Sequence, residues 1–166
     1  MPNTEIELDP VDFVTVGTVG PKGRRVFHLQ AGKGPQTVTL TIEKIQAQAL
    51  AEAVDEMLDD LQNKYPDRIE TNTNLSRWDM SLRDPLDPIF RVAQMGLGYD
   101  EERNLIVLVA QELVVTEEEQ FNPDPQVVRI WATREQMRAL SEHARLMVKQ
   151  GRADPKSNGH MIYYWT

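Results

Sequence analysis

One stretch that occurs twice decides the fold of this chain: VTLTIEKIQAQALAE at residues 38–52 and VRIWATREQMRALSE at residues 128–142. The two copies align without a gap at a constant offset of 90 residues. Each copy runs from a β-branched segment into a segment with helical spacing of its apolar residues. Because a strand and a helix repeat together, the sequence predicts two copies of one supersecondary unit. The repeat constrains the fold and leaves the chemistry open.

Strand and turn signals precede each copy of the repeat. Runs rich in β-branched residues end at glycine, proline or asparagine turns, which is typical of antiparallel strands joined by short connections. The predicted strands are residues 13–20, 25–31 and 38–42 in the first half, with a turn at 32–36, and 90–97, 105–113 and 127–131 in the second.

A helix is predicted after the third strand of each half. The first helix covers about residues 43–63, where Ala49, Leu50, Ala53 and Val54 belong to one broad apolar stripe. The second ends near residue 150 and begins at a predicted capping box in which Thr133 and Gln136 bond each other's backbone.

The predicted fold class is α+β. We expect two pseudosymmetric β-β-β-α units, giving about six strands in antiparallel sheet or sheets and two main helices around one core. The whole chain, 1–166, is expected to be a single domain. Unit one lies at about 11–63, a connector at 64–88, unit two at about 89–151 and a tail at 152–166.

The strand faces that point away from the core differ between the two units. In the first unit this face is polar, and we expect water to cover it; it carries His28, Gln30, Thr39 and Thr41. At the matching positions the second unit carries Val107, Val109, Arg129 and Trp131.

An apolar outward face requires a cover, so Val107, Val109 and Trp131 are predicted to be mostly buried. The cover is either intramolecular or a second copy of the chain, which would make a homo-oligomer through these three residues. The intramolecular candidates are Trp78, Leu82 and the tail residues 162–165.

Composition excludes several function classes. The chain has 166 residues and a net charge of −8, and its acidic surface disfavours binding to nucleic-acid phosphates. No cysteine is present, so disulfides, thiol catalysis and thiolate metal sites are excluded. The first ten residues lack the basic and apolar regions of a signal peptide, and no apolar run reaches the ~20 residues that a membrane span needs. We expect a cytoplasmic protein with neither a nucleic-acid nor a membrane partner.

No catalytic motif is evident. The three histidines, His28, His143 and His160, are far apart in the sequence, so no metal site and no cofactor are predicted. The sequence GKGPQ at 32–36 is superficially similar to a phosphate loop, but it joins two strands and lacks the helix N-terminus that would hold phosphate. Whether the protein is an enzyme stays open at this point.

Several segments together resemble a bacterial protein family known as domain of unknown function 3090 (DUF3090). They are LDPVDFVTVGTVGPKGRRVFHLQA at 8–31, VTLTIEKIQAQALAEAVDEMLDDL at 38–61, PIFRVAQMGLGYDEERNLIVLVAQEL at 88–113, and residues 128–149. The resemblance covers nearly the whole chain and preserves the order of the blocks. It implies a bacterial protein, and it implies no activity, because the family has none established.

The resemblance also implies a C-terminal knuckle with CxxC-type cysteine pairs, which many members carry after a glycine-arginine pair. Here Gly151-Arg152 is followed within a few residues by Asn158-Gly159, with no cysteine between them. Zinc is therefore not carried over to this chain.

The leading functional hypothesis is a small binding or regulatory module of unknown partner. The alternative is an enzyme or small-molecule binder whose site lies in the cleft between the two repeat units. The candidate binding residues are Arg25, His28, Gln30, Arg129, Trp131, Asn158 and His160. A deep cleft with converging polar groups would favour the alternative, and a flat apolar patch would favour the module.

Overall fold

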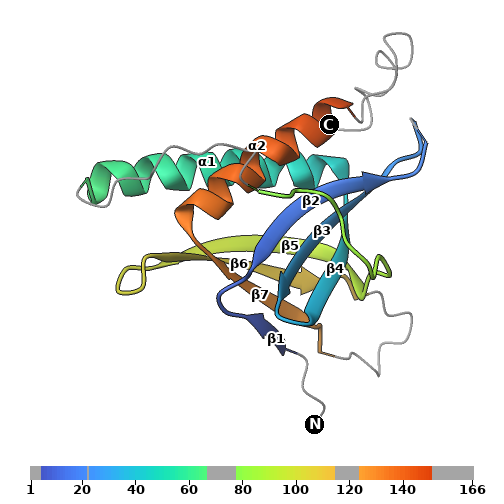
Figure 1. The fold of residues 1–166 in the computed structure, drawn as a ribbon, viewed down its shortest axis with the longest axis horizontal. Helices are drawn as coiled ribbons and strands as arrows, with labels where there is room; N and C mark the ends of the chain where they lie inside the picture. The colour runs from blue at the N-terminus through green and yellow to red at the C-terminus, as the bar shows by residue number, and fades with distance from the viewer. Residues whose placement is uncertain (1–4, 22, 67–77, 115–123, 151–166) are drawn as a thin grey trace.

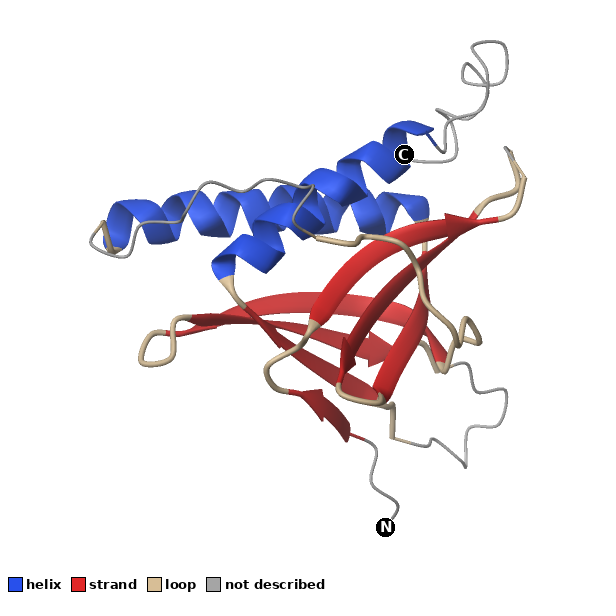
Figure 2. Ribbon diagram, viewed as in Figure 1, coloured by secondary structure: helices blue, strands red, loops and turns tan. Residues whose placement is uncertain are grey.

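A computed structural model describes residues 5–21, 23–66, 78–114 and 124–150 of the chain. Within these ranges the chain forms one sheet of seven strands with two helices packed over it (Figures 1 and 2). The fold class is α+β, as the sequence predicts. The sheet has one strand more than the predicted six.

The strand order in the sheet is β1-β7-β6-β5-β4-β3-β2. Neighbouring strands are antiparallel except at two places, where β1 runs parallel to β7 and β4 runs parallel to β5. The strands are β1 Glu5–Leu8, β2 Phe13–Val19, β3 Val26–Lys33, β4 Gln36–Ile42, β5 Phe90–Asp100, β6 Leu105–Glu112 and β7 Val127–Ala132.

The order β-β-β-α occurs twice along the chain, as β2-β3-β4-α1 and as β5-β6-β7-α2. Helix α1 covers Lys44–Lys64 and helix α2 covers Arg134–Gln150. The two halves of the sheet join at β4 and β5, which pair only through Leu40–Phe90 and Thr41–Arg91. Strand β4 ends one residue beyond these pairs, at Ile42, so most of β5 extends past the end of β4.

Two local features differ from the sequence predictions. Strand β1 was not expected; its four residues alternate between Glu and apolar side chains, a signal too short to stand out in an acidic segment. The turn predicted at 32–36 is tighter, because β3 and β4 pair as far as Lys33–Gln36. Gly34 permits this turn with a φ of 57°, a conformation that glycine adopts without steric cost.

Both helices begin with the same reciprocal capping arrangement. At α2 the Gln136 backbone N–H donates to Thr133 Oγ1 at 3.1 Å, and the Thr133 N–H donates to Gln136 Oε1 at 2.9 Å. The predicted capping box is thus confirmed. At α1 the Glu43 N–H donates to Gln46 Oε1 at 2.7 Å. The caps satisfy backbone donors that a helix start leaves without intrahelical partners.

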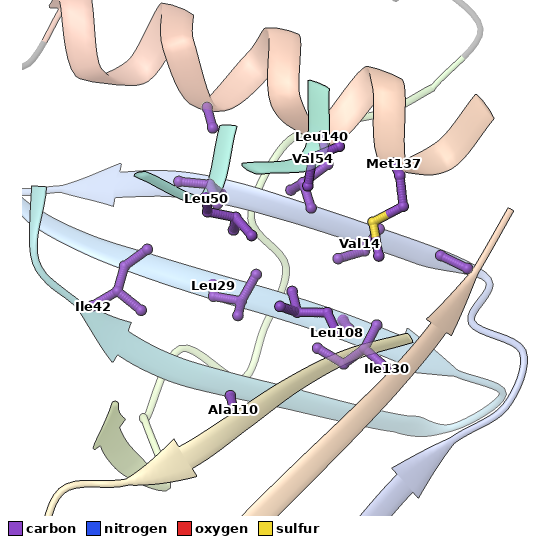
Figure 3. Packing of buried hydrophobic residues seen from close by; sticks show 14 of the residues in the cluster. Val14, Leu29, Ile42, Leu50, Val54, Leu108, Ala110, Ile130, Met137 and Leu140 are labelled. Carbon is purple, nitrogen blue, oxygen red and sulfur yellow. The ribbon is translucent and has the colours of Figure 1, made fainter. Parts of the chain in front are cut away.

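The core lies between the helices and the concave side of the sheet. Figure 3 shows Leu50 and Val54 of α1 and Met137 and Leu140 of α2 directed toward strand residues. Full burial of each large apolar side chain contributes about 1.5–3 kcal/mol, so this layer accounts for much of the fold's stability. The strand residues labelled in Figure 3 are Val14, Leu29, Ile42, Leu108, Ala110 and Ile130, all buried.

Candidate functional site

The polar outer face of β2, β3 and β4 is buried, which corrects the expectation that water covers it. Segment 78–88 of the chain's own connector lies over this face, and Gln30 and Thr39 are 0% and 1% exposed beneath it. The Gln30 side chain donates from Nε2 to the Arg83 carbonyl at 2.6 Å and accepts from the Arg83 N–H at 2.8 Å. Thr39 Oγ1 donates to the Pro85 carbonyl at 2.9 Å. The polar side chains therefore replace water as hydrogen-bond partners of this segment.

His28 is buried on the same face, next to Thr41, which is also buried rather than wet. Its side chain is 7% exposed, and Nδ1 has no hydrogen-bond partner within the described part of the chain. Burial lowers the pKa of His28 below its usual value, outweighing a backbone hydrogen bond with Leu40 that raises it. A neutral imidazole is thus favoured, because the charged form would lose hydration there.

The remaining predicted binding residues lie in separate places. Arg25 donates to the Gln150 carbonyl at 3.0 Å, where it satisfies the C-terminal end of α2. Arg129 donates to Glu5 of β1 at 2.8 Å. Asn158 and His160 fall outside the described residues. Arg25, His28 and Gln30 do not converge with Arg129 and Trp131 into one site.

Val107, Val109 and Trp131 are mostly buried, as the sequence predicts, although none is fully enclosed. Trp131 Nε1 donates to Glu7 Oε2 at 2.7 Å, and the Arg103 guanidinium lies 4.9 Å from the centre of the indole ring. The cover is not Leu82: its side chain lies against Gly17 of β2, in the other half of the sheet. The tail residues proposed as a cover lie outside the described ranges.

An open apolar groove separates α1 from β5, and we call it the α1–β5 groove. Its volume is about 350 Å³. Leu50 and Leu108 are buried at its floor, whereas Ala49 and Ala53 on the helix side are exposed. It is lined by Gln46, Ala49, Leu50 and Ala53 of α1, Ala93, Gln94, Met95, Gly96 and Leu97 of β5, and Leu108 of β6.

The groove is open because small side chains line it. Ala49 and Ala53 stand one helical turn apart and reach only a short way toward β5. Gln46 closes one end, where its Nε2 donates to the Val92 carbonyl at 3.1 Å. The groove therefore lies between α1 of the first half and β5 and β6 of the second, in the place that the alternative hypothesis assigns to a ligand site.

Sequence reasoning missed the residues of this groove. The predicted buried stripe of α1 includes Ala49 and Ala53, but these two are exposed, and Ala47 and Ala51 are buried in their place. Leu50 of the predicted stripe is buried as expected. The sequence signal for the groove is the pair of alanines four residues apart, Ala49 and Ala53, on the side of α1 that faces the second half of the fold. Alanine is compatible with burial and with exposure, so that signal does not distinguish a core from a groove.

Within the described ranges, no group of three or more His, Asp or Glu side chains lies close enough together to bind a metal ion. Neither α1 nor α2 is long and apolar enough to cross a membrane.

Comparison with known proteins identifies the family. The model for the family described as protein of unknown function (DUF3090) matches residues 6–158, and the chain belongs to that family. No curated protein and no solved structure matches the chain significantly.

Proposed function

We propose that the protein is a binding module whose site is the α1–β5 groove and whose ligand or partner inserts an apolar group there. The observation that carries this proposal is an open apolar groove of about 350 Å³ between the two halves of the fold. Concave, mostly apolar sites of this size with a few polar groups are typical of binding sites. Gln46 and Gln94 supply the polar side chains of the lining.

The proposal assigns binding, not catalysis, to the groove. Its ten lining residues are aliphatic, glycine, methionine or glutamine, and none is an acid, a base or a nucleophile. Proton transfer and covalent catalysis both require such a group within hydrogen-bond reach of the ligand. Catalysis at the groove would need reactive groups that its lining does not supply.

A neutral, apolar dye tests the site directly. Wild-type protein should enhance the fluorescence of Nile red saturably, because the dye enters the groove. Ala53→Trp should abolish the enhancement by filling the groove with an indole. Gln48→Trp is the matched control, since Gln48 is exposed on α1 and does not line the groove. No enhancement by wild-type protein, or equal enhancement by both variants, would contradict the proposal.

Three further expectations accompany this function. We propose that the protein acts in the bacterial cytoplasm, which its charged, cysteine-free composition supports and which fractionation of the source cells can test. The matched β-β-β-α orders support an origin by internal duplication. A homo-oligomer through Val107, Val109 and Trp131 stays a prediction that sedimentation can examine.

A further inference from the structure

One long edge of β5 has no partner strand within the described part of the chain. On one side β5 pairs with β6 from Val92 to Asp100. On the other side its pairing with β4 stops at Arg91. The Gln46 side chain lies within 3.1 Å and 3.4 Å of the Val92 and Ala93 carbonyls, which places the start of this free edge at the groove.

The free edge lacks most of the protection that natural proteins give to such strands. Exposed edges are usually interrupted by lysine or proline, or are covered by another segment. Residues 93–99, AQMGLGY, contain no charged residue and no proline. A bulge between Val92 and Gln94 is the one protective device here, and it lies at the start of the edge. Ala93 in the bulge is exposed, and so are Gln94 and Gly96 beyond it.

At the corresponding place in the other half, a segment of the chain lies beside the strand without filling the space. There α2 packs along β2, just as α1 lies along β5, and the connector passes beside the same strand (Figure 1). Thr15 of β2 donates from Oγ1 to the Met80 carbonyl at 2.7 Å, and Leu82 lies against Gly17. Two spaces remain between β2, α2 and residues 78–83: a small cavity of about 50 Å³, and an open pocket of about 380 Å³ beside Gly17, Leu82 and His143. A chain segment thus lies beside α2 and β2, whereas no described segment lies in the groove beside β5.

We propose that the occupant of the α1–β5 groove is an extended segment of another protein that adds to the free edge of β5 as a strand; this rests on the proposed function. Backbone hydrogen bonds to the edge would hold the segment, as in other cases of β-strand addition. Alternate side chains would enter the groove beneath α1, because successive residues of a strand point to opposite faces. Those side chains are apolar, to match Ala49, Leu50 and Ala53.

The acidic residues of α1 indicate which charge the partner carries beside its apolar segment. Glu52, Glu56 and Asp60 are exposed along the helix beside the groove, and they make no ion pair within the described residues. The chain as a whole carries a net charge of −8. Lysine or arginine residues flanking the apolar segment would therefore be attracted, and acidic flanks would be repelled.

A peptide array tests this proposal on the full-length protein. The probes are Lys-flanked heptapeptides in which Val, Ile, Leu or Phe alternates with Thr, together with the same peptides flanked by Glu. We expect a subset of the Lys-flanked peptides to bind, binding by the Glu-flanked set to be weaker, and the difference to shrink as salt is raised. Absence of binding by every peptide, or preference for Glu flanks, would overturn the proposal.

N-methylated versions of the strongest peptide distinguish strand addition from simple apolar contact. Only every second amide of an added strand faces the edge, so methylating one alternate set should weaken binding about tenfold or more, and methylating the other set should not. Equal effects of the two sets would refute strand addition. Hydrogen exchange should show slower exchange of amides in residues 93–97 when peptide is bound, and unchanged exchange there would refute it too.

Controls separate the two proposals. Ala53→Trp should lose peptide binding and Gln48→Trp should keep it, with both variants checked for native circular dichroism. If wild-type protein binds Nile red in the groove but binds no peptide, the proposed site stands and the peptide proposal fails. If sedimentation shows a dimer that the peptide dissociates, a second copy of this chain is the occupant, and the proposal of a foreign segment is wrong.

Discussion

Replacement of Gln30 by leucine should release the segment that covers β2, β3 and β4. Gln30 is 0% exposed, and its amide both accepts from the Arg83 N–H and donates to the Arg83 carbonyl. Leucine has a similar size and no polar atoms, so it leaves these two backbone groups without partners. Each buried polar group that loses its hydrogen-bond partner lowers the free energy of unfolding by about 1–3 kcal/mol. Because Arg83 is near the surface and water reaches it in part, we expect a loss of about 2–4 kcal/mol in the free energy of unfolding.

Urea unfolding monitored by circular dichroism measures this loss. With a slope of about 2 kcal/mol per M for a domain of this size, the midpoint should fall by about 1–2 M. Gln48→Leu is the control, because Gln48 is exposed on α1, and it should change the free energy by less than about 0.5 kcal/mol. Hydrogen exchange should also show faster exchange of the Arg83 amide in Gln30→Leu alone. An unchanged midpoint for Gln30→Leu would mean that Gln30 does not hold this segment.

Two other predictions concern the buried histidines and the packing at Gly17. Burial lowers the pKa of both His28 and His143 from the usual 6.5, so the unfolded chain binds protons more readily than the folded chain. The free energy of unfolding should therefore be highest above about pH 6.5 and should fall as the pH drops below that value. His28→Gln should reduce this fall. If the variant and the wild-type protein show the same pH dependence, burial of His28 does not contribute to it. Gly17→Ala should lower the free energy of unfolding by about 1–3 kcal/mol, because the alanine Cβ would lie 2.5 Å from Leu82 Cγ. Gly96→Ala should lower it by less than about 0.5 kcal/mol, because no atom lies within 4 Å of the position that the new Cβ would take. Equal melting temperatures for the two glycine variants would show that Leu82 moves aside freely.

Much of the fold follows from local patterns. The repeat at 38–52 and 128–142 predicts both helices, the third strand of each half and the element order. The capping box of Thr133 and Gln136 depends on residues three apart, so it can be identified from sequence alone. Strand ends differ by a few residues because pairing with a neighbour, and not the strand's own sequence, decides where a strand stops.

The burial of Gln30 and Thr39 could not be predicted in the same way. Alternation with apolar residues places them on the second face of the sheet, and a polar face is usually wet. The covering segment has no periodic pattern of its own, and its binding uses backbone groups of Arg83 and Pro85, which every residue type supplies. A side-chain pattern therefore identifies the face correctly but carries no information about what covers it.

The groove depends on an asymmetry that no single copy of the repeat contains. In one half α2 packs along β2, and residues 78–83 of the connector lie beside both elements. In the other half β4 ends at Ile42, so β5 extends past it, and α1 presents Ala49 and Ala53 to a strand edge that no described segment covers. One connector lies between the two units, so it can cover the face of one half only. The connector therefore lies beside β2 and α2 in one half, and in the other half no described segment lies in the apolar groove beside the free edge of β5.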